Sequence, residues 1–96
     1  MLETIVGCKW SLQILELIKR GVCRPGAIRR TVPGLTTKVQ SGCLTRFVAF
    51  GILKRTVFPE IPPHVEYHLT GFGLRFVPLL DEIEALQHEI AGETAT

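Results

Sequence analysis

The 96-residue sequence contains no apolar run that could cross a bilayer and no N-terminal segment of the kind that directs secretion. Its longest apolar stretches, such as residues 76–80, fall far short of the roughly 18 residues that a membrane span requires. Residues 1–4 lack the charged and apolar regions of a signal peptide. We therefore expect a soluble protein in the cytoplasm, without a membrane partner.

Paired cysteines and catalytic motifs are missing as well. The three cysteines, Cys8, Cys23 and Cys43, form no C-x-x-C pair, which excludes the common zinc and thioredoxin-like motifs. The histidines show no metal-ligand clustering, and neither a Gly-rich phosphate loop nor a G-x-S-x-G motif occurs. The sequence thus predicts no enzyme activity, no cofactor and no metal.

Acidic residues are absent between Leu17 and Pro59, a segment that carries nine basic residues. From Glu60 onward the balance reverses, with seven acidic residues against Arg75 alone. The net charge of +2 therefore conceals a basic half and an acidic tail. A basic segment of this kind suits a polyanion such as nucleic acid, because each neutralised phosphate releases counterions. The alternative is a solvated positive face without a partner.

The length predicts a single domain over residues 1–96. A hydrophobic fraction of 46% with 21% charged residues is typical of globular chains and excludes disorder. A chain of this size buries only about 60–65% of its unfolded surface, so it would gain stability from a partner subunit.

The first half of the sequence predicts three helices. Residues 10–21 show apolar positions at helical spacing and end at Gly21, a common helix stop. Pro25 suits the first turn of a short helix over residues 25–31. After a Pro-Gly turn at 33–34, Thr36 or Thr37 can cap a helix that runs to about residue 50.

The second half predicts a β-hairpin and a long helix. Residues 52–58 and 65–69 are rich in strand formers, and the prolines of residues 59–63 confine that segment to a loop. Thr70 can cap a last helix to about Ala91, whose apolar residues step by three and four as in a coiled-coil stripe. The order predicts an α+β, mostly α, winged helix-turn-helix: 24–50 for the helix-turn-helix, 52–69 for the wing and 70–91 for a dimerisation helix.

Four segments resemble the HxlR-type winged helix-turn-helix transcriptional regulators of bacteria, which are MarR-like. Residues 7–11 read G-C-K-W-S, residues 24–30 read R-P-G-A-I-R-R and residues 34–44 read G-L-T-T-K-V-Q-S-G-C-L. The most specific segment is the wing, where residues 59–73 read P-E-I-P-P-H-V-E-Y-H-L-T-G-F-G. The resemblance covers about residues 2–87. It implies a homodimer that binds double-stranded operator DNA in the major groove.

The candidate DNA contacts lie on the helix-turn-helix and the wing. They are Arg24, Arg29, Arg30, Thr36, Thr37, Lys38, Ser41, Thr45, Arg55 and His64. Each has a simpler alternative: helix capping for the threonines, solvated charges for the arginines, and an exposed turn for His64. The candidate dimer contacts lie on the last helix and are Phe76, Leu79, Leu80, Ile83, Leu86 and Ile90.

Several positions depart from the family pattern. Gln40 stands where the family has an inward leucine, and Val48, Ala49 and Phe50 leave an unusually apolar end to the same helix. These departures favour a second hypothesis, a degenerate winged-helix module for protein interaction with weak DNA binding. Cys8 and Cys43 support a third, a thiol-based regulator that answers an oxidant or small-molecule signal. Structural thiols are the simpler interpretation of both cysteines.

Overall fold

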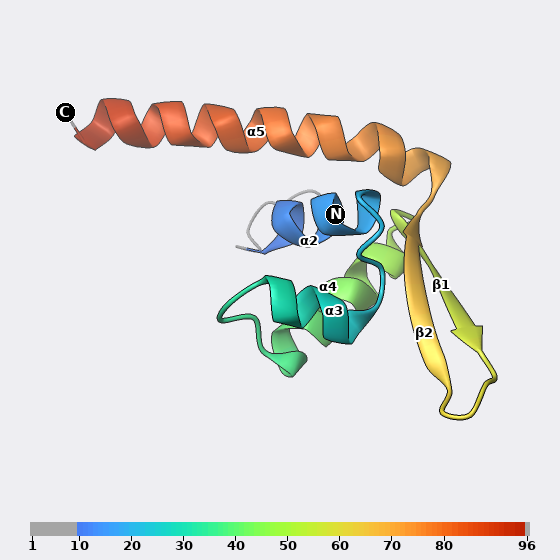
Figure 1. Cartoon of the computed structure of the whole chain (residues 1–96). Helices are drawn as coiled ribbons and strands as arrows, with labels where there is room; N and C mark the ends of the chain where they lie inside the picture. Colours follow the sequence, from blue (N-terminus) through green and yellow to red (C-terminus); the bar gives the residue numbers. More distant parts are fainter. Residues whose placement is uncertain (1–9, 96) are drawn as a thin grey trace.

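The computed structural model describes residues 10–95 and has the predicted order of elements (Figure 1). Helices and strands follow the chain as α2 (Ser11–Lys19), α3 (Pro25–Thr31), α4 (Thr37–Ala49), β1 (Leu53–Phe58), β2 (His64–Leu69) and α5 (Gly71–Ala95). The winged helix-turn-helix prediction is confirmed. The long last helix runs on past Pro78.

Helices α2 and α4 end in the same way, at a glycine with positive φ. Gly21 has φ +102° and Gly51 has φ +77°, a backbone region that side chains disfavour. After α2, the amide of Val22 donates to the carbonyl of Leu17 at 2.9 Å, and after α4 the amide of Ile52 donates to Phe47 at 2.9 Å. These bonds satisfy carbonyls that a helix end otherwise leaves unpaired.

A threonine side chain determines where α4 begins. The amide of Val39 donates to Oγ1 of Thr36 at 3.2 Å, so Thr36 is the N-cap and Thr37 is the first helical residue. The sequence left this choice open between the two threonines. The tight turn before the cap passes through Gly34, whose φ of +88° suits glycine.

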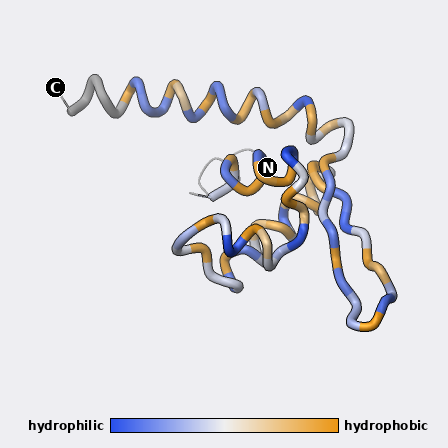
Figure 2. The backbone as a smooth tube through the Cα atoms, viewed as in Figure 1, coloured by the Kyte–Doolittle hydropathy of each residue, from blue (hydrophilic) through white to orange (hydrophobic). Residues whose placement is uncertain are grey.

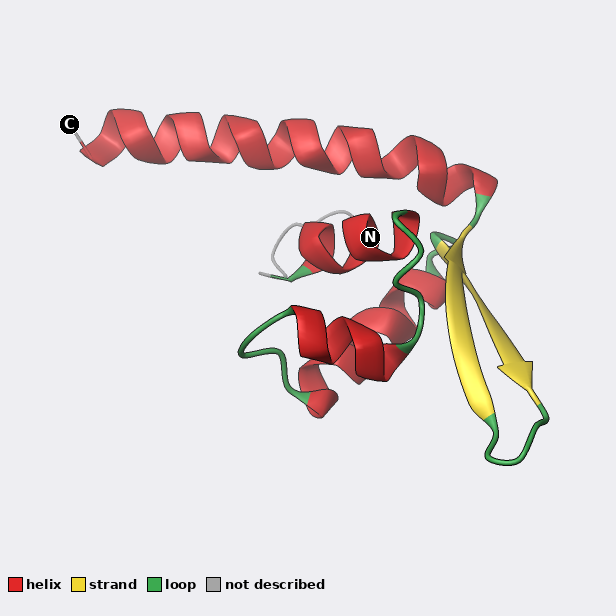
Figure 3. Ribbon diagram, viewed as in Figure 1, coloured by secondary structure: helices red, strands yellow, loops and turns green. Residues whose placement is uncertain are grey.

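Strands β1 and β2 form an antiparallel hairpin at the edge of the helices (Figure 3). Leu53 pairs with Leu69 and Phe58 pairs with His64, so the second strand begins one residue before its predicted start. Residues 59–63 lie in the connecting loop, as the prolines predict.

The core gathers apolar side chains from α2, α3, α4, β1 and the start of α5. Figure 2 shows hydrophobic residues, in orange, recurring along these elements. Phe76 and Leu80 are 5% and 0% exposed in this core, which corrects their assignment as dimer contacts. The sequence pattern assigns the whole apolar stripe of the last helix to a second subunit, but the first turns of this helix cover the chain's own core. Farther along, Leu86 and Ile90 remain 57% and 61% exposed.

The corner where β2 turns into α5 lies against the corner where α4 turns into β1. The carbonyl of Ile52 accepts a hydrogen bond from the amide of Thr70 at 3.1 Å, and the hydroxyl of Thr70 is shared between the carbonyls of Gly51 at 2.5 Å and Ile52 at 3.2 Å. The hydroxyl of Thr70 in turn accepts from the amide of Gly73 at 2.9 Å. A Cβ on Gly73 would stand 2.2 Å from the Ile52 carbonyl oxygen, so this approach requires glycine.

Candidate nucleic-acid interface

One face of α4 is exposed and polar. Lys38, Ser41 and Thr45 follow one another at intervals of three and four residues, so they lie along one side of the helix, and Thr37 precedes them at its start. All four side chains are exposed, while the opposite face of α4 enters the core. The side chain of Thr36 is engaged in capping, so its role in the fold is structural.

A groove of about 400 Å³ runs between α4 and the hairpin. We name it the α4–wing groove, and its lining residues are Pro25, Arg29, Gln40, Ser41, Leu44, Thr45, Val48, Arg55 and Tyr67. None of these lining residues is acidic, whereas two are arginines and several offer hydroxyl groups. Guanidinium and hydroxyl donors without a competing carboxylate suit phosphate and base-edge acceptors.

The structure explains how the polar side chain of Gln40 is accommodated at the inward position of α4, where the family pattern has leucine. Its side chain is 1% exposed, its Nε2 donates to the carbonyl of Pro25 at 2.7 Å, and its Oε1 accepts from Nη1 of Arg29 at 2.6 Å. The buried amide is therefore fully engaged between α3 and α4. It holds the guanidinium of Arg29 at the wall of the α4–wing groove. Sequence reasoning missed this pairing, although a polar residue at an inward position signals a buried partner.

Two further candidate arginines lie where DNA could reach them. Arg55 lines the groove and Arg30 is exposed on α3, as a phosphate contact requires. Lys54 and Arg55 were expected to face opposite sides of their strand, and Lys54 is not among the residues that line the groove.

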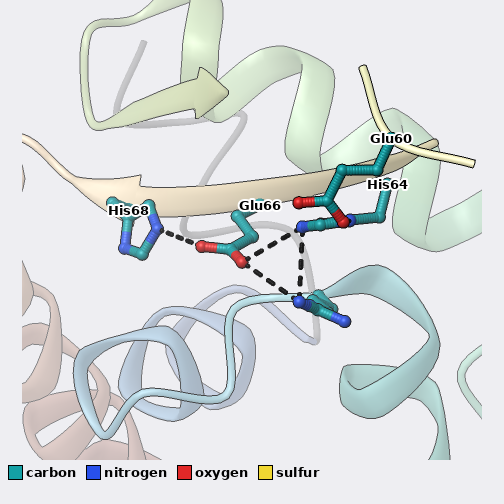
Figure 4. A network of polar contacts seen from close by, with 5 residues as sticks. Glu60, His64, Glu66 and His68 are labelled. Atoms are coloured by element: carbon teal, nitrogen blue, oxygen red, sulfur yellow. Dashed lines mark hydrogen bonds and ion pairs between the residues drawn. The ribbon is translucent and has the colours of Figure 1, made fainter. Parts of the chain in front are cut away.

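Arg24 and His64 form a polar network with Glu60 and Glu66 where the start of α3 meets the wing (Figure 4), and the side chain of Arg24 remains 57% exposed. Nη2 of Arg24 lies 3.4 Å from Oε2 of Glu66 and 3.3 Å from Nε2 of His64. The ring of His64 stacks on Phe58 with centroids 4.6 Å apart, and its Nδ1 lies 3.3 Å from Oε2 of Glu60. His64 is thus half-buried at the start of β2 rather than in an exposed turn, and its contact with DNA stays a prediction, as does that of Arg24.

The same network reaches Cys23 through Glu66. A hydrogen bond of 3.0 Å with His68, assisted by the charge of Arg24, holds the pKa of Glu66 below its usual range. Burial, followed by the negative charge of Glu66, raises the pKa of the Cys23 thiol. Sequence reasoning found no cluster here, because Cys23 and Glu66 are far apart in the chain.

Of the two candidate redox cysteines, Cys43 is buried. Cys8 lies outside the described residues. Cys43 is 0% exposed on the inner side of α4, where its Sγ accepts from Nη2 of Arg46 at 3.6 Å. A buried thiol of this kind offers little access to an oxidant.

The acidic and basic halves of the sequence occupy different sides of the molecule. Figure 1 shows α5 on one side of α2, with α3 and α4 on the other. Most of the late acidic residues lie on α5, whereas the cationic groove is formed by α3, α4 and the wing. A polyanion can therefore approach α4 without facing the acidic helix. None of the described helices is long and apolar enough to span a membrane.

Comparison with known proteins finds helix-turn-helix transcriptional regulators. The model of the HxlR-like helix-turn-helix family matches residues 5–94. A protein of Methanothermobacter thermautotrophicus, described as an uncharacterized HTH-type transcriptional regulator, is 36% identical over 81% of this chain and 60% of its own length. The chain spans 53–69% of the length of three such curated relatives.

Solved structures agree in fold. A MarR-family transcriptional regulator from Porphyromonas gingivalis W83 superimposes with a TM-score of 0.75 at 36% identity, covering 90% of this chain and 84% of that one. The redox regulator HypR in its oxidized form superimposes with a TM-score of 0.75 at 29% identity, covering 90% and 89%.

Proposed function

The chain belongs to the HxlR-like helix-turn-helix family, and from this premise we propose that it is a dimeric, sequence-specific DNA-binding transcriptional regulator in the cytoplasm. The observation that carries the proposal is the exposed polar face of α4 beside a groove with two arginines and no acid. In this family of folds the second helix of the helix-turn-helix enters the major groove. The proposal involves no catalytic step and no cofactor.

The residues divide into those that read bases and those that hold the backbone. Thr37, Ser41 and Thr45 present hydroxyls along α4, where they can reach base edges. Lys38 and Arg30 offer exposed cations to phosphates near α4. Arg29 and Arg55 do the same from the two walls of the α4–wing groove.

The dimer is proposed to form through the exposed apolar residues of α5. Leu79, Leu86 and Ile90 are each more than half exposed, and they are separated by seven and four residues. This spacing places them on one side of the helix, where a second copy can cover them. Ile83 lies between them and is half-buried.

Fluorescence anisotropy tests the proposal directly. The protein would be titrated into DNA from upstream of its own gene and into scrambled DNA at two salt concentrations. We expect selective binding whose log affinity falls with log salt by about 0.9 for each phosphate contact. Lys38→Ala should weaken binding to both probes, Thr37→Ala should reduce the preference between them, and Lys19→Ala on α2 serves as the control. If both α4 variants bind an identified operator like the wild type, the placement of α4 is wrong.

A redox-responsive regulator is the second candidate, and the similarity to HypR favours it. Replacement of Cys8, Cys23 and Cys43 by serine, one at a time and together, tests this candidate. An oxidant response of DNA binding that persists without any thiol would remove it. A folded dimer that binds both probes weakly and equally would instead favour a protein-interaction module.

A further inference from the structure

The fold brings a thiol, a carboxylate and an imidazole together beside the wing. One ligand atom each from Cys23, Glu66 and His68 lies within 4.8 Å of the others. Cys23 lies in the turn between α2 and α3, whereas Glu66 and His68 alternate along β2 and therefore share one face of the strand. The amide of Tyr67 donates to the carbonyl of Cys23 at 2.9 Å, which fixes the turn against the strand.

The donor set has the chemistry of a zinc-type site. Zinc binds sulfur, imidazole nitrogen and carboxylate oxygen, whereas calcium and magnesium prefer oxygen alone. Tetrahedral bonds of about 2.0–2.3 Å place neighbouring ligand atoms roughly 3.3–3.8 Å apart. Small side-chain rotations would bring atoms that already lie within 4.8 Å to that spacing. A thiolate and a carboxylate together also balance the charge of a divalent cation.

The two carboxylate oxygens of Glu66 have different partners. Oε1 of Glu66 lies 3.0 Å from Nε2 of His68, on the side of the cluster. Oε2 faces Nη2 of Arg24 at 3.4 Å and Nε2 of His64 at 3.5 Å (Figure 4). A cation bound between Oε1 and the ring of His68 would replace the hydrogen bond between them and leave the contacts of Oε2 in place, and such outer partners orient a ligating carboxylate.

We propose that Cys23, Glu66 and His68 form a binding site for a thiophilic divalent cation of the zinc type. Three protein ligands leave a fourth position for water or another group. The cation joins the turn before α3 to strand β2, and so holds the wing against the helix-turn-helix. An effect of the cation on DNA affinity follows from this link, and that consequence alone rests on the proposed function.

Cobalt titration of tag-free, reduced, metal-free protein tests the site without DNA. Co²⁺ bound by a thiolate gives a sulfur-to-metal charge-transfer band in the near ultraviolet, which Zn²⁺ should abolish by displacement. We expect saturation at about one cation per chain. Cys23→Ser should remove the band, and His68→Gln should weaken Zn²⁺ binding in a chelator competition by about tenfold or more.

Matched controls separate this site from the other thiols and imidazoles. Cys8→Ser, Cys43→Ser and His88→Gln should keep both the band and the Zn²⁺ affinity, and circular dichroism should show that every variant is folded. If Cys23→Ser does not fold, Glu66→Gln tests the same site and should also weaken Zn²⁺ binding. Absence of the band in the wild type, or its loss in Cys8→Ser or Cys43→Ser but not in Cys23→Ser, would overturn the proposal. Zinc binding without any change in DNA affinity would keep the site and refute only its link to DNA.

Discussion

Replacing Gly73 with alanine should destabilise the chain, although alanine is the better helix former. The added Cβ would stand 2.2 Å from the carbonyl oxygen of Ile52, which is more than about 1 Å short of an ordinary contact. The carbonyl cannot turn aside without weakening its hydrogen bond from the Thr70 amide at 3.1 Å. The first turn of α5 must therefore move away from the corner between α4 and β1.

The steric cost of the added Cβ exceeds the gain from the higher helix propensity of alanine. Overpacking of this kind costs about 1–3 kcal/mol, and a weakened hydrogen bond adds about 1 kcal/mol. Removing a helical glycine returns up to about 1 kcal/mol, so the net loss in the free energy of unfolding is about 1–3 kcal/mol. In a domain of this size that corresponds to a fall in Tm of roughly 4 °C or more.

Urea and thermal unfolding, followed by circular dichroism at one fixed protein concentration, measure the effect. Gly71→Ala is the matched control, because it lies in the same first turn and a Cβ there would meet nothing within 4 Å. Gly71→Ala should be neutral or slightly stabilising. A Gly73→Ala variant as stable as Gly71→Ala would refute the reasoning.

Three further predictions concern the groove, the acidic helix and the dimer. Gln40→Leu and Arg29→Ala should each weaken DNA binding. The double variant should lose about 1 kcal/mol less binding free energy than the sum of the single losses, because Gln40 acts by positioning Arg29. Additive losses would contradict this. Burial, with the charges of nearby acids, raises the pKa of Glu84, so its ionised form opposes folding above that pKa. Glu84→Gln should therefore stabilise the chain in urea at pH 7, and the gain should shrink as the pH falls toward about 4; a gain that is independent of pH would count against this cause. Leu86→Glu should give a folded monomer in sedimentation experiments, because this side chain is 57% exposed, and a wild type that is itself monomeric would argue against the proposed interface.

Local signals in the sequence were sufficient to predict the elements. Pro25, the glycines that end two helices and the proline-rich loop each act on their own neighbourhood, so the helices and the hairpin could be predicted within a few residues. The helical spacing on α4 likewise indicated which residues face outward. These features depend on adjacent residues alone.

Contacts between distant residues could not be predicted in this way. An apolar stripe does not reveal whether a partner or the chain itself covers it. The sequence therefore assigns Phe76 and Leu80 to a dimer interface, although both lie in the core. The pairing of Arg29 with Gln40, and the meeting of Cys23 with Glu66, depend on how separate elements pack. From the sequence alone, Arg29 is an isolated charge, Gln40 a departure from the family pattern and Cys23 an isolated thiol.

The close approach of α5 to the corner between α4 and β1 has a consequence for the geometry of an operator. Because Gly73 and Thr70 lock that corner, the wing and α4 must rotate together with the first turns of α5. In a two-fold dimer built on α5, the crossing angle of the two long helices would set the distance between the two copies of α4. Half-sites read by such pairs lie one helical turn apart, about 34–36 Å, or a multiple of it. The length of the spacer in the operator would then report the angle at which two copies of this chain cross.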